Sequence, residues 1–488
     1  MDKLFRISVT ALFGAAIFAF WMWLYPQALS YHEQYQLFLF TWDYLAQRLS
    51  VSGGLADWLS EFLVQFFFLR WSGALVLAIV AICLQLAVWH ASRSVRPDGS
   101  RFLYALSFVP SLLILIYMGN TEVLVSFPVA LTLSVALCPL FARAGWHTLW
   151  LIPLAWWLLG PVALVPVLFA VLLGRRPLHW ALLIYTSIVV YALYRLFLSQ
   201  YTPRDVLFGI NYGRLREMLP ALQVIIPVVT LLCIFACAVP VRLRQMALAE
   251  GALLFLLAAG TLLGVKASYD RDTYEMIAYD DLIRHGKYKE VIERAEHYQP
   301  HSPISSCSVN FCLFMEGQLS RRLTEFYQCG TGGLVLPSIR DSFSDLTSAE
   351  IFFMMGMPNT ALQYYFDCME SIQNCRLSGR FLSRMADCNL INGWWGSADK
   401  YLDILSKSLF YRKDALRRKK MVGSDQAVSA DPVYAYVRAV RFKEDFISSY
   451  EALDLMMALL YNQDNNNFMA GEYYSVWQRL KKKEGGAQ

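Results

Sequence analysis

Residues 247–275 read ALAEGALLFLLAAGTLLGVKASYDRDTYE, and within them the chain changes character. Before Lys266, almost every charge lies in a short connector between long apolar stretches. After Tyr269, charged residues return at the density usual for a soluble protein and continue to the end. The sequence therefore predicts a membrane-embedded domain over residues 1–268 and a soluble domain over residues 269–488.

The composition is typical of a polytopic membrane protein. Of the 488 residues, 57% are hydrophobic and 15% are aromatic, which is high for a soluble enzyme. The apolar stretches are continuous rather than alternating, and in lipid only helices or closed barrels satisfy the backbone hydrogen bonds. We therefore expect an all-α fold, with a transmembrane helix bundle followed by a soluble α-solenoid. The net charge of +5 is modest, and no basic block with interleaved aromatic residues predicts nucleic-acid binding.

Seven stretches are long and apolar enough to be single membrane spans. They cover residues 5–25, 64–90, 102–118, 123–142, 179–198, 220–240 and 247–266. An eighth stretch, 148–173, is interrupted at Gly160-Pro161, and we expect two half-helices that enter the membrane and return to the same side. This choice keeps most arginines on one side, which the positive-inside rule assigns to the cytoplasm. The N-terminus is then cytoplasmic and the soluble domain periplasmic, in a bacterial inner membrane.

This topology places three loops of the membrane domain on the outer face, at residues 26–63, 119–122 and 199–219. The first loop carries His32-Glu33-Gln34 just beyond the first span, within a segment too apolar and aromatic for a free loop. Helices lying flat at the membrane interface suit that composition. In one interpretation the three polar residues only cap such a helix. In the other, Glu33 is a carboxylate held beside a lipid-borne substrate.

The second and third outer loops add candidates for the same site. Glu122 lies on the same face as Glu33, and two carboxylates there can share a divalent cation such as Mg²⁺ or Mn²⁺. Alternatively, one carboxylate is a general base, or Glu122 is only a turn residue that suits the start of a helix. Arginines of the third loop suit a lipid phosphate, unless they are ordinary charges near the headgroups. The candidates for substrate contact are His32, Gln34, Arg204, Arg214 and Arg216.

By layout, residues 1–266 resemble the membrane-embedded glycosyltransferases of the GT-C superfamily. Those enzymes use a lipid-phosphate-linked sugar donor on the outer face, and their first outer loop carries an essential acidic residue. The resemblance implies that Glu33 is the base or a metal ligand, that Glu122 is a second ligand, and that the donor is a polyprenyl-phosphate-linked sugar. The chain departs from the pattern because neither loop contains a paired Asp-Asp, Asp-Glu or Asp-x-Asp.

The whole chain also resembles a family of multi-pass bacterial membrane proteins with a helical-repeat tail. The stretches that carry this resemblance are His32-Glu33-Gln34, Gly53-Gly54-Leu55, Gln65-Phe66-Phe67, Gly356-Met357-Pro358-Asn359 and Leu390-Ile391-Asn392-Gly393. The resemblance implies a two-part helical protein and brings no activity with it.

The soluble domain repeats a pattern in which a glycine closes one helical stretch and a small or branched apolar residue follows five positions later. The pattern occurs at Gly286, Gly356 and Gly393, with a weaker version at Gly317. The intervals of 31, 39 and 37 residues lie near the roughly 34 residues of tetratricopeptide repeats. We therefore predict a degenerate tetratricopeptide-like solenoid over residues 274–481, the alternative being an irregular helical domain.

Six of the ten cysteines lie in the soluble domain, where a periplasmic location permits disulfides. Cys368 and Cys375 are two helical turns apart, a spacing that buried core cysteines also show. We expect mostly free core thiols, and no Cys-x-x-Cys predicts a zinc site.

The leading functional hypothesis is a membrane-embedded glycosyltransferase that uses a polyprenyl-phosphate-linked sugar donor at the outer face. The alternative is a non-catalytic scaffold whose tetratricopeptide-like tail recruits envelope proteins. A transporter is third, because the spans carry few of the intramembrane charges that line substrate paths. The expected partners are the lipid bilayer, the lipid-linked sugar and an envelope protein that binds the tail.

Overall fold

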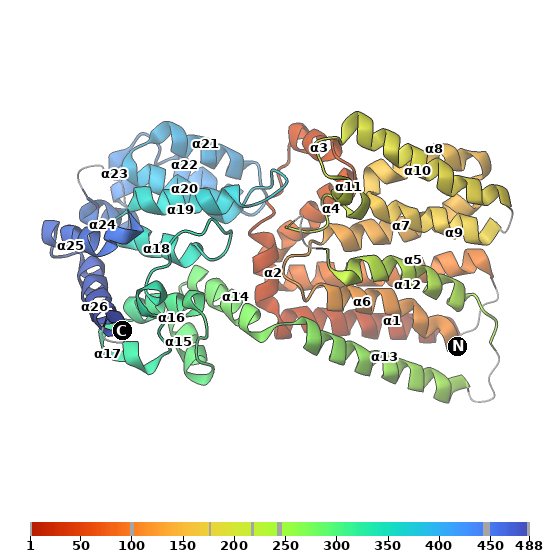
Figure 1. The fold of residues 1–488 in the computed structure, drawn as a ribbon, viewed down its shortest axis with the longest axis horizontal. Coiled ribbons are helices and arrows are strands. Elements are labelled where there is room, and N and C mark those ends of the chain that lie inside the picture. Colours follow the sequence, from red (N-terminus) through yellow and green to blue (C-terminus); the bar gives the residue numbers. More distant parts are fainter. Residues whose placement is uncertain are drawn as a thin grey trace. The chain divides into compact units, whose positions relative to one another are not determined.

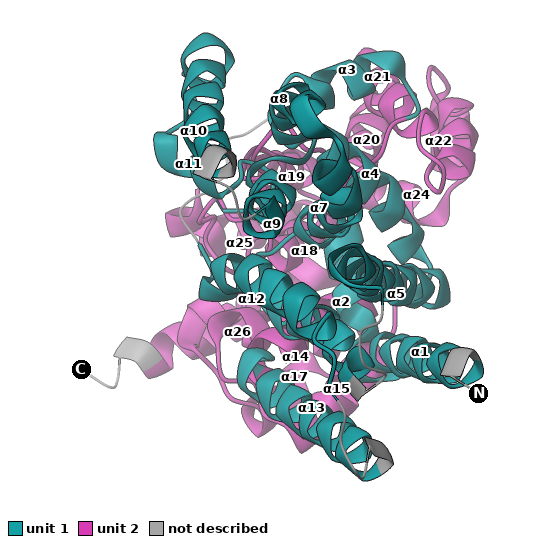
Figure 2. Cartoon of the chain, turned by 90° about the vertical axis from the view of Figure 1, so that its right-hand side faces the viewer, with its two compact units in different colours: residues 1–33, 40–270 teal, residues 34–39, 271–488 magenta. Residues whose placement is uncertain are grey.

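The computed structural model describes residues 2–97, 102–174, 177–215, 219–241, 246–442 and 449–485. Within these ranges the chain is helical, and an isolated antiparallel bridge between Val123 and Gly213 is its single β-contact. The predicted all-α class is therefore confirmed. The chain divides into two compact units, which Figure 2 colours separately. Unit 1 comprises residues 1–33 and 40–270, and unit 2 comprises residues 34–39 and 271–488.

Unit 1 is a helix bundle in which α5 packs against α1, α7 and α12 (Figure 1). Its main helices are α1 (Asp2–Ala19), α5 (Arg70–Val95), α6 (Val109–Tyr117), α7 (Ser126–Arg143), α10 (Pro177–Phe197), α12 (Ala221–Cys237) and α13 (Met246–Ser268). Its shorter helices are α2 (Pro26–Glu33), α3 (Trp42–Leu49), α4 (Gly54–Val64), α8 (Thr148–Leu159), α9 (Leu164–Gly174) and α11 (Pro203–Phe208).

Five helices of unit 1 are long and apolar enough to cross a membrane. They are Leu4–Leu24, Arg70–Val95, Ser126–Arg143, Trp180–Phe197 and Leu248–Ser268. In Trp180–Phe197 and Leu248–Ser268, only 6% of the residues in the most apolar stretch are buried within the protein. Along α13, for example, Phe255 is 72% and Leu262 is 71% exposed. Large apolar side chains that protein leaves uncovered on a helix of this length indicate contact with a lipid bilayer.

Three predicted spans differ from the structure in length or start. The stretches 102–118 and 220–240 contain shorter apolar helices, Leu103–Tyr117 and Ala221–Cys237. The span predicted from residue 64 begins only at Arg70, because a 3₁₀ turn and the extended backbone of Leu69 (φ −107°, ψ 123°) precede it. A continuous apolar run does not show such an interruption, since both helix types accept the same side chains.

The stretch 148–173 forms two short helices, α8 and α9, on either side of Gly160, as the Gly-Pro pair predicts. Gly160 has φ 76° and ψ −157°, a combination essentially restricted to glycine. A Cβ at Gly160 would lie 2.9 Å from the hydroxyl oxygen of Tyr212 and 3.5 Å from Cα of Gly53. Both short helices pack against α7 and α10.

Unit 2 is built from consecutive helices that pack in pairs, such as α18 with α19 and α20 with α21 (Figure 1). Its first six helices are α14 (Arg271–Arg284), α15 (Tyr288–His297), α16 (Pro303–Met315), α17 (Leu319–Arg322), α18 (Leu346–Met354) and α19 (Pro358–Glu370). Those that follow are α20 (Gly379–Asn392), α21 (Trp395–Ser406), α22 (Arg412–Lys419), α23 (Asp425–Ser429), α24 (Pro432–Val440), α25 (Leu453–Gln463) and α26 (Phe468–Gly485).

Four helices of unit 2 end in the same hydrogen-bonded turn. In each, the glycine N–H donates to the carbonyl three residues back, and the next N–H donates to the carbonyl five residues before it, which is the Schellman motif. The apolar residue five positions after the glycine is fully buried at three of these turns. The sequence pattern therefore identifies helix–helix turns. The glycines, with φ between 66° and 87°, are Gly286, Gly317, Gly356 and Gly393, and the buried residues are Val291, Ala361 and Ala398.

Two details of the tail differ from the regular repeat. After Gly317 the second helix, α17, has only four residues, and residues 323–345 that follow contain only two short 3₁₀ turns. The expected helical spacing of Cys368 and Cys375 is wrong, because α19 ends at Glu370 and Cys375 lies in the following turn with φ 52°. Cys368 is buried and Cys375 is exposed, and neither forms a disulfide.

One segment of the first loop, residues 34–39, belongs to unit 2 and not to the unit that surrounds it in sequence. Its backbone is anchored there, because the N–H of Leu37 donates to the carbonyl of Leu377 (2.8 Å). The chain therefore passes from unit 1 to unit 2 after Glu33, returns at Phe40, and passes again at Arg271. The hydrophobicity pattern, which divides the chain once near residue 268, does not predict this insertion.

Candidate functional site in the loops of unit 1

The first and third loops of unit 1 meet at the C-terminal end of α8. Ser52 donates its hydroxyl to the carbonyl of Trp156 (3.0 Å), and the N–H of Gly53 donates to the carbonyl of Trp157 (2.8 Å). The hydroxyl of Tyr212 donates to the carbonyl of Leu159. The last carbonyls of a helix have no partner within it, so these three donors attach both loops to the broken helix end.

The second and third loops are joined through their backbones. The N–H of Leu124 donates to the carbonyl of Tyr212 (3.0 Å), and the N–H of Arg214 donates to the carbonyl of Glu122 (2.8 Å). The hydroxyl of Ser126 donates to the carbonyl of Asn211. All three predicted outer loops of unit 1 therefore lie in one cluster, although they are far apart in sequence.

Arg214 connects this cluster to the end of α2. Its Nη2 donates to the carbonyl of Tyr31 (3.2 Å) and lies 3.3 Å from Nδ1 of His32. Its guanidinium also lies over the ring of Tyr31, 4.3 Å from the ring centroid. A cation at a helix C-terminus interacts favourably with the helix dipole. The guanidinium predicted to hold a phosphate thus binds the protein itself, and its role in the structure is to position α2.

His32 is held as a neutral imidazole. The side chain is 1% exposed, and burial, assisted by the positive charge of Arg214, lowers its pKa well below the ordinary value. Since Nδ1 faces the guanidinium, Nδ1 accepts and the proton lies on Nε2. Neutral His32 therefore contributes to the joint between α2 and the third loop.

We predict that acid weakens this joint. Because the folded pKa of His32 lies below the unfolded one, its contribution to stability is complete above about pH 6.5. As the pH falls below that value, the unfolded chain binds a proton that the folded chain excludes, and stability drops by up to about 1.4 kcal/mol per pH unit until the folded pKa is reached. Thermal unfolding of the purified protein between pH 7.5 and 5 measures this loss. A His32→Gln variant, which keeps an acceptor for Arg214, should show a shallower decline, and parallel profiles would contradict the assignment.

The two predicted carboxylates differ in their surroundings. Glu33, the last residue of α2, is buried at 4% exposure, whereas Glu122 is half-buried in its turn. The N–H of Glu122 donates to Asn120 Oδ1 (2.9 Å). Within the described ranges there is no group of three or more His, Cys, Asp or Glu side chains that could hold a metal ion.

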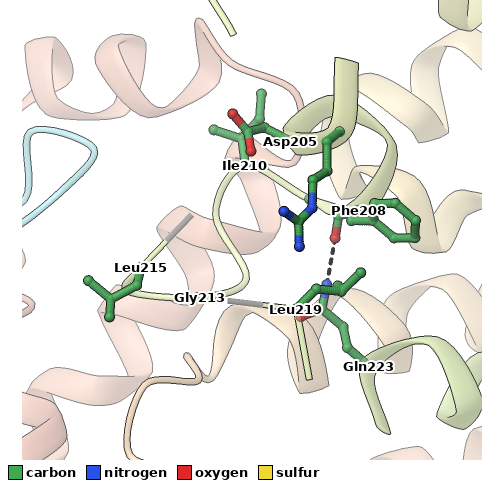
Figure 3. Close-up of a pocket in the computed structure, with 9 residues that line it drawn as sticks. Asp205, Phe208, Ile210, Gly213, Leu215, Leu219 and Gln223 are labelled. Carbon is green, nitrogen blue, oxygen red and sulfur yellow. Dashed lines mark hydrogen bonds between the residues drawn. The ribbon is translucent and has the colours of Figure 1, made fainter. Parts of the chain in front are cut away.

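Arg204 lies at a small pocket formed by α11, the third loop and the start of α12 (Figure 3). Asp205 and Thr202 form a capping box that fixes the start of α11. Across the pocket, Nε2 of Gln223 donates to the carbonyl of Phe208 (2.6 Å). The volume of about 20 Å³ is enough for one water, and the Arg204 side chain at this pocket is exposed.

An apolar groove of about 210 Å³ lies next to this pocket and shares Phe208 and Gln223 with it. Side chains from α7, α9, α11 and α12 line it, and Val224 and Val228 remain 44% and 55% exposed. The remaining wall includes Phe127, Val162, Val165, Leu168 and Leu231. A charged mouth beside an apolar groove matches a ligand with an anionic head and a hydrocarbon tail.

A buried ionic network in the first loop is the feature that the sequence analysis missed. Arg48 Nε lies 2.9 Å from Glu61 Oε2, and Arg48 Nη1 lies 3.9 Å from Asp57 Oδ2. The Tyr44 hydroxyl donates to Glu61 and accepts from Arg48 Nη2 (3.3 Å). All four side chains are at most 5% exposed. Burial alone would lower the pKa of Arg48, but Glu61, Tyr44 and Asp57 together raise it above its ordinary value.

Two sequence signals could have identified this network. Tyr44 and Arg48 are four residues apart on α3, and Asp57 and Glu61 are four apart on α4, so each pair occupies one helix face. The tight turn at Gly53 brings the two faces together. Because the acidic pair is buried with an arginine, its immediate role is to hold α3 against α4.

One of the predicted substrate contacts lies away from the loop cluster. Gln34 belongs to unit 2, where its side-chain oxygen accepts from Arg380 Nη1 (2.9 Å). Arg216 lies outside the described residues. The structure thus brings His32, Arg214 and the backbone of Glu122 together, and Arg204 lies at the pocket of the same third loop.

Comparison with known proteins identifies the family of this chain. A family model matches residues 3–483, nearly the whole chain, and is described as a family of unknown function, DUF6057. No curated protein and no solved structure matches the chain.

Proposed function

We propose that this chain, which belongs to the family of unknown function DUF6057, is a membrane-embedded transferase. It transfers a sugar or glycan from a polyprenyl-phosphate donor at the outer face of the inner membrane. The observation that carries this proposal is the exposed Arg204 at a pocket that adjoins an apolar groove. Arg204 is suited to the donor phosphate, and the groove is suited to the first part of the prenyl chain.

In the proposed reaction, the acceptor hydroxyl attacks the anomeric carbon of the donor sugar. A new carbon–oxygen bond forms, the bond between that carbon and the phosphate oxygen breaks, and the polyprenyl phosphate leaves with the bonding electron pair. The acceptor proton passes to the carboxylate of Glu33, which acts as general base. Glu122 is the second carboxylate of the cluster, and Arg204 stabilises the phosphate charge that develops on the leaving group.

The proposal includes an orientation. With the N-terminus in the cytoplasm, the loops of unit 1 and the whole of unit 2 lie in the periplasm. The helix pairs of unit 2, with their four Schellman turns, support a tetratricopeptide-like solenoid that recognises a protein acceptor. A phosphatase fused after Gln488 should then be active, whereas a cytoplasmic reporter at the same position should not.

The second candidate is a non-catalytic scaffold, and the positions of Arg214 and Gln34 favour it. Both side chains were predicted to contact substrate, and in the structure both contact protein groups. In this alternative, unit 1 is an anchor and the helix pairs of unit 2 recruit envelope proteins.

A glycan profile of envelope proteins and lipids discriminates the two functions. Cells lacking this protein are complemented with wild type, with Glu33→Gln, or with Arg204→Leu. We expect a glycan to be lost in the deletion strain and restored by wild type alone, because the two variants remove the base and the phosphate contact.

The matched control for charge is Glu370→Gln, which removes a carboxylate from the exposed end of α19. This variant should restore the profile fully. If Glu33→Gln also restores it at equal protein level, or if the deletion changes no glycan, the glycosyltransferase proposal fails and the scaffold is the better description.

A further inference from the structure

Helix α4 of the first loop directs its polar side chains into the protein. Asp57 and Glu61 lie beside Arg48 of α3, and Ser60 and the following Gln65 are also buried. None of the four polar side chains from α4 and its end is more than 6% exposed. The helix packs against α7 and α8, which are both apolar. The charged groups of α4 therefore face protein and not solvent.

The opposite side of α4 is an apolar stripe. Every side chain between residues 55 and 66 that is not buried is a leucine, phenylalanine or tryptophan. Their spacing of three and four residues places them on one helix face. Phe62 packs against both Trp58 and Phe66, with ring centroids 6.4 and 5.6 Å apart. We call this face the α4 stripe, and it consists of Leu55, Trp58, Leu59, Phe62, Leu63 and Phe66.

This arrangement of the two faces suits lipid and not water. A helix on the surface of a soluble protein turns its apolar residues to the core and its charges to solvent. In a bilayer the arrangement is reversed, because ionisable groups face the protein interior and pair with one another. The 11 residues of α4 span about 16 Å at 1.5 Å per residue, roughly half of the 30 Å hydrocarbon core. The helix is therefore too short to cross and reaches only one leaflet.

Exposed apolar side chains continue from the α4 stripe onto a membrane-type helix. Phe68 and Leu69 are exposed, and they connect the stripe to α5, one of the five helices long enough to cross a membrane. At the start of α5, Trp71 is 56% exposed, and Leu75 is exposed one turn later. Arg70 is the one charged residue between them, and arginine and tryptophan at the end of a span are typical of the headgroup level. This continuity favours lipid over a protein partner as the neighbour of the stripe.

We propose that the α4 stripe contacts lipid in one leaflet, at the end of the bundle where α5 begins, so that the first loop is partly embedded in the bilayer. Composition predicted interfacial helices in this loop, but not which helix face meets lipid. Lipid on the stripe shields the buried network of Arg48, Asp57 and Glu61 from water on the side that protein does not cover. This contact is independent of both proposed functions, because it involves no reaction.

Carbene footprinting of the wild-type protein in lipid nanodiscs gives the first test. One probe is a phenyl diazirine that dissolves in the bilayer, and the other is a charged diazirine that stays in water. We expect the lipid-soluble probe to label residues 55–66 about as strongly as α5 and at least about tenfold more than α22, whose exposed side chains are mainly basic. The water-soluble probe should give the reverse order.

Two results of the footprinting would overturn the proposal. Strong labelling of residues 55–66 by the water-soluble probe would place the stripe in solvent. Labelling by neither probe, with α5 still labelled from the lipid, would mean that a second copy of the chain or another protein covers the stripe.

Spin labels test the same contact at single positions. Leu59→Cys on the α4 stripe and Gln47→Cys on the exposed side of α3 are labelled in separate full-length variants that lack the accessible native cysteines. We expect the label at position 59 to collide more often with oxygen, which concentrates in lipid, than with a water-soluble nickel complex. The label at position 47 should show the opposite preference. Equal preferences at the two positions would contradict the lipid contact, and Leu63→Cys, one turn along the stripe, replaces Leu59→Cys if that variant does not fold.

Discussion

Replacement of Arg48 by methionine is expected to destabilise unit 1 by about 3–5 kcal/mol, the range measured when one member of a buried ion pair is removed. Arg48 lies 2.9 Å from Glu61 and 3.9 Å from Asp57, whose side chains are at most 1% exposed. Without Arg48, both buried carboxylates lose this positive charge. We expect little folded protein to accumulate in the membrane, and a lowered midpoint of thermal unfolding in detergent for the protein that does.

The matched control neutralises the whole network in place. The triple variant Arg48→Met/Asp57→Asn/Glu61→Gln keeps similar side-chain volumes and a hydrogen-bond acceptor for Tyr44, and removes the three charges of this network. It should recover most of the lost stability, because the cost in the single variant is the uncompensated charge and not lost packing. Equal destabilisation of the single and triple variants would mean that Arg48 acts through packing against the Tyr44 ring.

The second large loss of stability is expected for Gly356→Ala, and Gly286→Ala is its control. Both glycines end helices of unit 2 in the left-handed region, with φ +87° and φ +68°. A Cβ at Gly356 would lie 2.8 Å from the carbonyl oxygen of Val440, whereas one at Gly286 has no atom within 4 Å. Alanine at Gly286 should therefore cost only the backbone strain, about 1–2 kcal/mol. Alanine at Gly356 adds a backbone clash, for a total of roughly 3–5 kcal/mol.

The measurement is hydrogen exchange or thermal unfolding of the two full-length variants side by side. In Gly356→Ala, loss of protection should include α18, α19 and the end of α24, because Asn467 Nδ2 also binds the carbonyls of Met355 and Val440 there. In Gly286→Ala, the loss of protection should be confined to α14 and α15. Equal losses in both variants would show that the turn geometry alone, and not the contact with Val440, sets the requirement for glycine.

The sequence predicted those parts of the fold that depend on local patterns. Continuous apolar runs predicted the membrane-type helices, since length and hydrophobicity are properties of single segments. The glycines at 286, 356 and 393 predicted helix–helix turns, because the left-handed C-terminal turn has a residue preference of its own. The break at Gly160 followed from the same reasoning. Helix starts were less accurate, as at Arg70, because a 3₁₀ turn and a helix accept the same apolar residues.

The candidate site was predictable only in part, because its contacts are not local. The sequence indicated that three loops share one face, and the backbone bonds of Arg214 to Glu122 and its side-chain contact with His32 bring them together. It did not indicate that Arg214 and Gln34 bind protein groups. The choice between an arginine that binds a phosphate and one that binds a helix end depends on three-dimensional neighbours. Likewise, the contact of Asp57 and Glu61 on α4 with Arg48 on α3 depends on how the two helices pack together.

The insertion of residues 34–39 into unit 2 also has a consequence for synthesis. Tyr35 is separated from its acceptor Ser342 by 307 residues, so at ribosomal rates of about 5–20 residues per second this acceptor does not exist until roughly 15–60 s after the segment is made. Throughout that time the segment, which contains Tyr35 and Phe38, follows α2 without the residues of unit 2 that bury it in the folded chain. A chain that is truncated before residue 377 can never bury it, and such a product should be an early target of membrane proteases.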